Sequence, residues 1–395
     1  MEECRDSPMS AVKRLSAETE SGRFAALVFA FCAEMGLDMI YFTIPLYASI
    51  LGAGPVLIGL LGSAYGMSYV FVAFLGPRLY GSVNRDLLLV ASLAGYTVLI
   101  SLYLILRTPF YFFLVRLGEG VALGVFWPIA DTVASDNAMG ERMIGWYNTG
   151  WSVAAVAAPY LSGFMIAETT VIAPVAGAMA FEAFDVVFVF AAIRVPKHVQ
   201  HAETKLPRVN SVTLFSVGLP AFVSAFLAGV VLTIYPPFLA GLRLPYTAIG
   251  LIAGSAGLTR TFMFAGSVRV EETVGKSVLA ILGFGFLSFI ALNSFTDNPY
   301  LLLASMLLVG IGLGALFHVG LDNALADTRN ATANVSLFEA SLGAGLLAGP
   351  LVAGILEHLY RAESFAAIAT VPVACVLLYS VSRRARSVGN TGRAA

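Results

Sequence analysis

Twelve apolar stretches of about 20 residues follow one another along the chain and leave little sequence for anything else. A transmembrane helix needs about 20 mainly apolar residues to cross the hydrocarbon core of a bilayer. The stretches lie at 24–50, 56–76, 86–106, 110–134, 143–166, 171–193, 212–240, 246–268, 277–295, 299–325, 332–357 and 363–382. Because the intervening polar segments are short, no large domain fits outside the membrane. The pattern therefore predicts an all-α membrane protein.

The composition narrows the function classes. Of 395 residues, 58% are apolar and 12% are charged, whereas an average soluble domain is about 25% charged. This balance excludes a disordered chain, a collagen and a nucleic-acid-binding protein. The three cysteines, Cys4, Cys32 and Cys375, are too far apart to form a metal-binding motif or a disulfide framework. We expect no metal site, and we expect the lipid bilayer to be the main surroundings of the protein.

The basic residues predict how the spans are oriented. Eighteen of the 23 lysines and arginines fall on the side of the N-terminus, three fall on the opposite side and two lie within spans. Basic residues collect on the cytoplasmic side of membrane proteins. No cleavable signal peptide is recognisable before the first span. We therefore expect a multi-pass protein of the plasma membrane with both termini in the cytoplasm.

A long polar segment near the middle divides the chain into two halves. We expect a cytoplasmic tail at 1–23, a six-helix bundle over 24–193, a cytoplasmic linker at 194–211, a second six-helix bundle over 212–382 and a cytoplasmic tail at 383–395.

The two halves repeat each other at a shift of about 191 residues. The matched pairs include Gly59 with Gly250, Gly66 with Gly257 and Pro45 with Pro236. Small residues recur in any packed helix bundle, but recurrence alone would not hold a constant register over several spans. A duplication of six spans with parallel halves is typical of transporters, whose substrate site lies between the halves near the middle of the membrane.

Four local motifs connect the chain to a known family. The first span has an aspartate seven residues before a proline, Asp38 to Pro45, and the loop after the second span reads GPRLYGSVNR over 76–85. The fourth span contains RLGEG over 116–120, and the fifth has a glycine- and proline-containing motif over 150–163. With these motifs, the chain resembles the major facilitator superfamily over nearly its whole length.

The resemblance implies twelve transmembrane helices in two pseudo-symmetric six-helix bundles, a monomer, a small-molecule substrate and alternating access. We expect no cofactor, and the carboxylates within the spans suggest the proton gradient as the energy source. Tyr80 stands where the loop motif of the family has an aspartate, so the resemblance does not extend to the charge relay of that motif. The sugar-porter signature PESPR is absent from the sequence.

Charged residues inside the spans are the first candidates for a site. An ionisable group in hydrocarbon costs about 2.5–3.5 kcal/mol on insertion scales, so it usually faces a cavity or a partner. Glu34 and Asp38 lie one helical turn apart and share a face of the first span. Two close carboxylates do not both ionise easily, so one of them is suited to carrying a proton. The alternative is a structural hydrogen bond to a neighbouring helix.

The fourth span contains Arg116 and Glu119, three residues apart. They are placed to neutralise each other as an ion pair. The resemblance also makes Arg116 a candidate for binding a substrate anion or for tuning a proton-carrying carboxylate.

Three further spans contain ionisable residues. In the tenth span, His318 and Asp322 lie four residues apart and suit a proton relay, although a satisfied buried histidine is an equal alternative. In the eighth span, Arg260 either faces the carboxylates across the symmetry axis or approaches the cytoplasmic end. Glu182 and Asp185 lie in the sixth span. Sixth helices of this family are peripheral, so an acid there must turn inward or reach an interface.

Matching positions in the fifth and eleventh spans carry Asn148 and Glu339, at a shift of 191. Both spans line the central cavity in the family, so we expect the two residues to contribute to a shared site. We expect Trp127 and Trp151 to line that cavity with aromatic rings.

These features favour a secondary active transporter that exports a small organic solute in exchange for protons. A proton-coupled importer of a small metabolite is the alternative, and Arg116 with Arg260 would suit an anionic one. A non-transporting receptor and an intramembrane enzyme are hypotheses of other classes. The sequence contains no GxxxxGK[ST], GxSxG or HExxH motif, which argues against ATP-driven pumping and against an enzyme.

Overall fold

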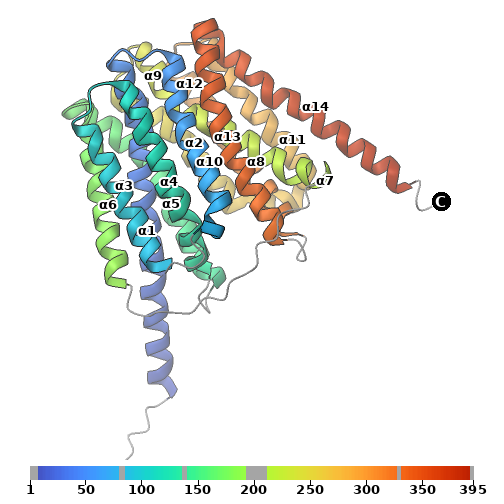
Figure 1. Cartoon of the computed structure of the whole chain (residues 1–395). Helices are drawn as coiled ribbons and strands as arrows, with labels where there is room; N and C mark the ends of the chain where they lie inside the picture. The colour runs from blue at the N-terminus through green and yellow to red at the C-terminus, as the bar shows by residue number, and fades with distance from the viewer. Residues whose placement is uncertain (1–7, 80–84, 136–139, 193–210, 327–330, 392–395) are drawn as a thin grey trace, which may run out of the picture.

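The computed structural model describes residues 8–79, 85–135, 140–192, 211–326 and 331–391, and Figure 1 shows that these residues form a bundle of helices. The N-terminal half consists of α1 (Pro8–Ile50), α2 (Pro55–Leu79), α3 (Arg85–Ser101) with η1 (Leu102–Leu104), α4 (Pro109–Ser135), α5 (Gly140–Glu168) and α6 (Ala173–Ala192). The C-terminal half consists of α7 (Ser211–Thr213), η2 (Leu214–Gly218), α8 (Leu219–Thr233), α9 (Tyr235–Gly241), α10 (Tyr246–Val274), α11 (Lys276–Leu287) with η3 (Ser288–Ser294), α12 (Pro299–Leu325), α13 (Ala331–Tyr360), η4 (Arg361–Glu363) and α14 (Ser364–Thr391).

The described helices confirm the predicted spans. Eleven segments are long and apolar enough to cross a membrane, and α14 adds a shorter apolar stretch over Ser364–Ser380. The first helix begins at Pro8, well before the apolar segment that starts at Phe24, and α14 continues to Thr391. The expected linker at 194–211 lies outside the described residues except for Ser211. The fold is thus the all-α, twelve-span arrangement that the sequence predicts.

The predicted span 212–240 folds as several short pieces because of its prolines. Pro236 and Pro237 lack the N–H groups that would continue the helix, so α8 ends at Thr233 and α9 begins at Tyr235. Nearer the start of the span, the five-residue π-helical segment η2 precedes α8.

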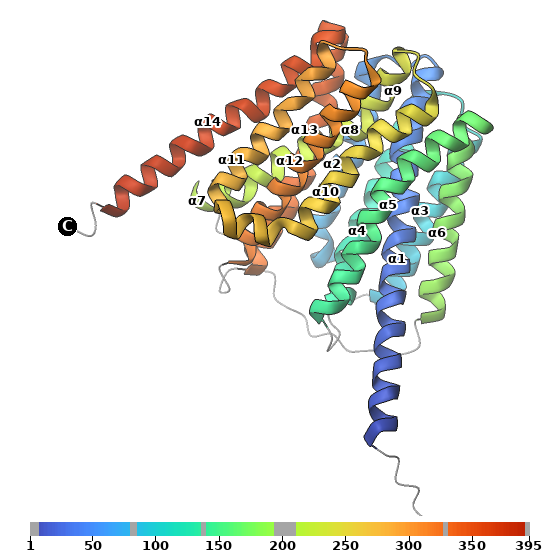
Figure 2. The same cartoon turned by 180° about the vertical axis from the view of Figure 1, so that it is seen from behind.

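Helix packing repeats between the halves. Within the halves, α1 packs on α5 as α8 packs on α13, and α2 packs on α4 as α10 packs on α12. Across the halves, α2 packs on α13 and α10 packs on α5. Figures 1 and 2 show these helices side by side from opposite directions. Each of these helix pairs in one half has an equivalent pair in the other half, and the two pairs that join the halves are equivalent to each other. The two bundles are therefore related by pseudo-symmetry.

The two largest helix contacts between the halves, α2 with α13 and α10 with α5, depend on glycines at matching positions. A Cβ atom added at Gly59 of α2 would lie 3.1 Å from the Cα atom of Gly354 of α13 and would overlap the carbonyl oxygen of Pro350. A Cβ atom added at Gly163 of α5 would lie 3.1 Å from the Cα atom of Gly250 of α10. Helices in membranes associate through such close packing of small residues, because lipid supplies no hydrophobic driving force. The repeated glycines therefore hold the halves together at two equivalent places.

These glycine contacts lie at the end of the molecule that carries the α1–α2 loop, opposite the N-terminus (Figure 1). Hydrogen bonds between the halves continue along both interfaces. The Ser63 hydroxyl donates to the Leu347 carbonyl at 2.7 Å, and the Thr261 hydroxyl donates to the Ser152 carbonyl at 3.3 Å. The halves are thus closed against each other at the loop end.

A valine at Gly59 should separate the halves at this end, because the added side chain collides with backbone atoms of α13 that have no room to move. Spin labels at Gly54 and Glu363, one in each half, would report the change as a longer distance by electron paramagnetic resonance. Gly285→Val is the matched control, since a Cβ atom there has no atom within 4 Å. An unchanged distance in Gly59→Val would contradict the role of the glycine contacts.

Candidate functional site

Charged residues from both halves lie within electrostatic reach of each other inside the molecule. On α1, Asp38 is only 5% exposed and Glu34 is half-buried. Arg260 of α10 interacts electrostatically with both carboxyl groups. The guanidinium carbon of Arg260 also lies 5.1 Å from the centre of the Trp151 ring on α5. The structure therefore brings four of the predicted site residues together across the boundary between the halves.

This arrangement has a clear electrostatic consequence. Among the described residues, nothing accepts a hydrogen bond from the buried Nε atom of Arg260. A guanidinium has five N–H donors and stays charged, so Arg260 is suited to binding an acceptor group. Because its attraction to Asp38 depends on the charge of that carboxyl group, a proton on Asp38 would weaken the contact between the halves.

A chain of aromatic rings continues from Trp151 into the C-terminal half. The ring centres of Trp151 and Phe264 are 5.7 Å apart, those of Phe264 and Phe317 are 5.3 Å apart, and those of Phe317 and Phe338 are 5.1 Å apart. These rings come from α5, α10, α12 and α13. Sequence reasoning missed the three phenylalanines, because nothing in the pattern distinguishes them among the 28 in the chain.

The remaining polar and aromatic candidates lie in several places. Asn148 is exposed, and its Oδ1 atom accepts a hydrogen bond from Nε1 of Trp151 at 3.2 Å. Trp127 and Trp151 pack against the same small cluster around Tyr147. Glu339 is half-buried on α13, the helix equivalent to α5. Asn148 thus belongs to the surroundings of Trp151.

Arg116 and Glu119 form a buried ion pair. The Nη1 atom of Arg116 lies 2.6 Å from Oε2 of Glu119, and the two side chains are 1% and 0% exposed. The guanidinium carbon of Arg116 also lies 4.3 Å from the Tyr41 ring centre and 5.1 Å from the Tyr65 ring centre. Arg116 is therefore neutralised and enclosed within the N-terminal half, as the ion-pair alternative expected, and its role toward substrate stays a prediction.

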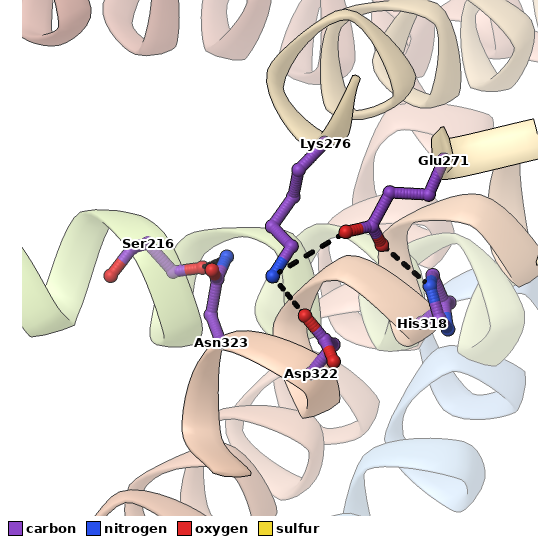
Figure 3. A network of polar contacts seen from close by, with 6 residues as sticks. All are labelled: Ser216, Glu271, Lys276, His318, Asp322 and Asn323. Atoms are coloured by element: carbon purple, nitrogen blue, oxygen red, sulfur yellow. Dashed lines mark hydrogen bonds and ion pairs between the residues drawn. The ribbon is translucent and has the colours of Figure 1, made fainter. Parts of the chain in front are cut away.

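His318 and Asp322 belong to a larger network, shown in Figure 3. The Nε2 atom of His318 lies 2.8 Å from Oε2 of Glu271, whereas Asp322 is paired with Lys276. Lys276 also lies 3.5 Å from Oε1 of Glu271. The predicted relay between His318 and Asp322 therefore does not form as a direct pair, because each side chain reaches a partner at the α10–α11 turn.

The internal repeat contained a signal for this network. At the shift of 191, Glu271 corresponds to Tyr80 and Lys276 to Arg85, so the C-terminal half has the acid that the N-terminal loop motif lacks. Residues 80–84 of the predicted loop at 76–85 lie outside the described residues. Gly275 forms the α10–α11 turn at φ +81°, a conformation that favours glycine, and places Lys276 directly beside the end of α10.

The network extends to the irregular start of the seventh span. Pro220 has no N–H group to donate to the carbonyl of Ser216, four residues earlier. Instead, the Asn323 amide nitrogen donates to the Ser216 carbonyl at 2.9 Å, and Figure 3 shows the two residues side by side. A backbone group freed in a membrane helix needs such a partner. All six residues of Figure 3 lie in the C-terminal half, so the network braces that half internally.

A crevice of about 470 Å³ lies along α2, α4 and α13. It is lined by Met67, Ser68, Val70, Phe71, Val72, Val121 and Leu347. Its lining is almost wholly apolar, and Met67, Phe71 and Val121 are exposed at the protein surface. The crevice therefore has none of the charged groups that meet around Arg260.

Removing either member of the buried ion pair should destabilise the protein more than removing both. A single Glu119→Leu change leaves the Arg116 charge buried and unpaired, which costs about 3–5 kcal/mol, whereas an apolar pair removes that penalty. Unfolding in detergent of Glu119→Leu, Arg116→Leu and the double variant measures this difference. Arg107→Leu, an exposed arginine bonded to Tyr47, is the control. A double variant less stable than both singles would contradict the ion-pair interpretation.

Comparison with known structures shows the same fold elsewhere. The nucleoside transporter NupG aligns with a TM-score of 0.73 at 15% identity, covering 91% of this chain and 98% of its own. The human organic anion transporter MFSD10 (TETRAN) aligns with a TM-score of 0.63 at 16% identity, covering 90% and 98%. A bacterial homolog of the human lysosomal transporter Spinster, in an inward-facing and occupied conformation, aligns with a TM-score of 0.69 at 14% identity, covering 93% and 97%. At these identities, the likeness concerns the fold alone.

The sequence comparisons give one family. No curated protein matches the sequence significantly. The model of the major facilitator superfamily matches residues 26–328, which is well over half of the chain. This match agrees with the twelve-span fold, the pseudo-symmetric halves and the structural neighbours. The chain belongs to the major facilitator superfamily of membrane transporters.

Proposed function

We propose that this protein exports a small organic solute in exchange for protons, by alternating access between its two halves. The main support is the meeting of Glu34 and Asp38 from one half with Arg260 from the other. A charge in hydrocarbon is costly and usually marks a substrate or ion pathway. A group of opposite charges that spans the boundary between moving halves is a means of coupling proton binding to their movement.

The coupling follows from the charge of Asp38. When Asp38 is ionised, its attraction to Arg260 favours the state in which the halves are close at the centre. A proton on Asp38 removes that attraction, and in an exchange the solute leaves when the proton binds, so proton and solute occupy the central site in turn. Proton and solute thus bias the same two-state movement, as coupled transport requires.

We also propose that the protein lies in the plasma membrane as a monomer, with both termini in the cytoplasm. The distribution of lysines and arginines supports this orientation. The end closed by Gly59 and Gly250 is then the outer end.

The surroundings of Arg260 indicate the kind of solute. The rings of Trp151 and Phe264 offer flat apolar surfaces beside a cation. A small organic molecule with a planar part and a hydrogen-bond acceptor fits these groups. The nucleoside transporter and the organic anion transporter with the same fold lend this class general support.

Import of a small anionic metabolite is the second candidate, favoured by the unused donor of Arg260. Arg116 does not add to this candidate, because Glu119 already neutralises it. The two candidates share the central site and differ in the charge of the solute and in the direction of net flux.

The Asp38→Asn variant should separate binding from energy coupling. The amide keeps the shape of the side chain but does not exchange a proton. In proteoliposomes with an imposed pH gradient, we expect the solute flux driven by the gradient to fall to the level of protein-free vesicles. Exchange of labelled for unlabelled solute across the membrane, without a pH gradient, should persist. The probes are a nucleoside, an organic anion and a lipophilic cation, each radiolabelled.

The matched control is Glu363→Gln, at an exposed acid between α13 and α14. Gradient-driven flux in Asp38→Asn equal to that of wild type would contradict proton coupling through Asp38. Flux in wild type that ignores the pH gradient would contradict proton coupling altogether.

Replacing Arg260 should distinguish the two candidate solutes. If the solute is anionic, exchange should be lost in Arg260→Ala and partly kept in Arg260→Lys, because lysine retains the charge but not the planar fork of donors. If the solute is neutral or cationic, both variants should bind it in a thermal-shift assay. Loss of exchange in both variants for a neutral solute would contradict a purely electrostatic role of Arg260.

A further inference from the structure

The sixth transmembrane helix contains two acids that the central site does not use. Glu182 and Asp185 are 1% and 0% exposed, and Glu182 lies near the middle of the apolar span Ala173–Phe190. The same helix exposes Phe184 and Val187 at its surface. Figure 2 shows α6 at the outer edge of the N-terminal half, beside α1 and α3. The two acids therefore face inward from a peripheral helix whose other face meets lipid.

No described residue neutralises either acid. All four carboxyl oxygens of Glu182 and Asp185 are buried without a hydrogen-bond partner among the described residues. Their described electrostatic neighbours are Cys32 and Glu34 of α1 and Tyr96 of α3, none of which is a cation. Both acids are thus buried in surroundings that oppose negative charge.

A glycine on α1 makes the space for one of them. A Cβ atom added at Gly36 would overlap Oε1 of Glu182 and would lie 2.7 Å from its Cδ atom. The Glu182 carboxyl group therefore sits directly against the backbone of α1. This close fit shows that the side chain enters the bundle rather than bending toward the lipid.

Protonation is the simplest way to accommodate the pair. Two unpaired carboxylates in hydrocarbon would cost several kcal/mol and would repel each other. A bound calcium ion needs about six to eight oxygen ligands and a zinc ion about four ligands, and the described residues include no group of three or more potential metal ligands. The occupant that fits two carboxyl groups, a thiol and a phenol is the proton.

The pair is also connected to the central site. Glu182 interacts electrostatically with Glu34, and Glu34 interacts with Asp38 and Arg260. Asp185 lies nearer than Glu182 to the end of α6 at Ala192. Acidic groups therefore continue from the back of the N-terminal half, through α1, to the boundary between the halves.

We propose that Glu182 and Asp185 form a second proton-binding site, behind α1, which exchanges protons with Glu34 of the central site. The proposal deepens the proposed function, since it rests on coupling to protons. It gives the peripheral sixth helix a role as a proton store beside the path of the solute.

Infrared spectroscopy of the purified full-length protein tests the site with the proton as the probe. A protonated carboxyl group has a carbonyl band that shifts when H2O is replaced by D2O. We expect Glu182→Gln and Asp185→Asn each to remove a resolved part of this band at neutral pH, and the double variant to remove both parts. Glu363→Gln, at an exposed position, should leave the band unchanged. Superimposable spectra of wild type and the double variant would overturn the site.

A second measurement tests the exchange with Glu34. Replacing Glu34 by glutamine removes the proposed exchange partner, so after transfer into D2O the carbonyl band of Glu182 should shift more slowly than in wild type. An unchanged rate of this shift would overturn the exchange. Gly36→Ala is an independent variant, which should shift the band of Glu182 by displacing its carboxyl group while keeping both acids.

Failure of this inference and failure of the proposed function give different results. The infrared experiment requires no solute, so it reads out the site whether or not transport is observed. Flux that ignores the pH gradient, together with loss of the band in the double variant, would contradict proton-driven export and leave the site in place. Flux driven by the gradient, together with an unchanged band, would contradict the second site alone.

Discussion

The cost of a charge in hydrocarbon organises the interior of this protein. An unpaired ionisable side chain costs about 2.5–3.5 kcal/mol on insertion scales, and the chain meets this cost in three ways. Arg116 is paired with Glu119 at 2.6 Å within one half. Glu34 and Asp38 face Arg260 across the two halves. Glu182 has no cation among its described neighbours, and we propose that a bound proton neutralises it.

Of these three arrangements, only the second depends on how the halves are placed relative to each other. The pair of Arg116 and Glu119 lies within α4 and moves with its own half. The network of Lys276, Glu271 and Asp322 likewise lies within the C-terminal half. Movement between the halves would leave both intact and would change the distances between Arg260 and the α1 carboxyl groups. This difference is the physical reason why we propose energy coupling at the central site.

Close packing at the glycines complements this electrostatic arrangement. The contacts of Gly59 with Gly354, and of Gly163 with Gly250, involve backbone atoms and no ionisable groups. They allow the halves to close at the loop end without creating a new charge pair there. Because lipid supplies no hydrophobic driving force between helices, the association at these places depends on the close packing itself.

The sequence alone determined the twelve spans, their helical class and the duplication, because apolar length and a constant repeat shift are local and periodic properties. It also placed Arg260 opposite the acids of the first span as one of two alternatives. It did not determine that His318 turns to Glu271 rather than to Asp322, since both are within reach until α10, α11 and α12 are packed. Nor did it show that Gly36 admits the Glu182 carboxyl group. The partner of His318 and the space for the Glu182 carboxyl group depend on which helix faces lie against each other. Only the tertiary structure decides which faces are in contact, because the faces of an apolar helix are hard to distinguish in sequence.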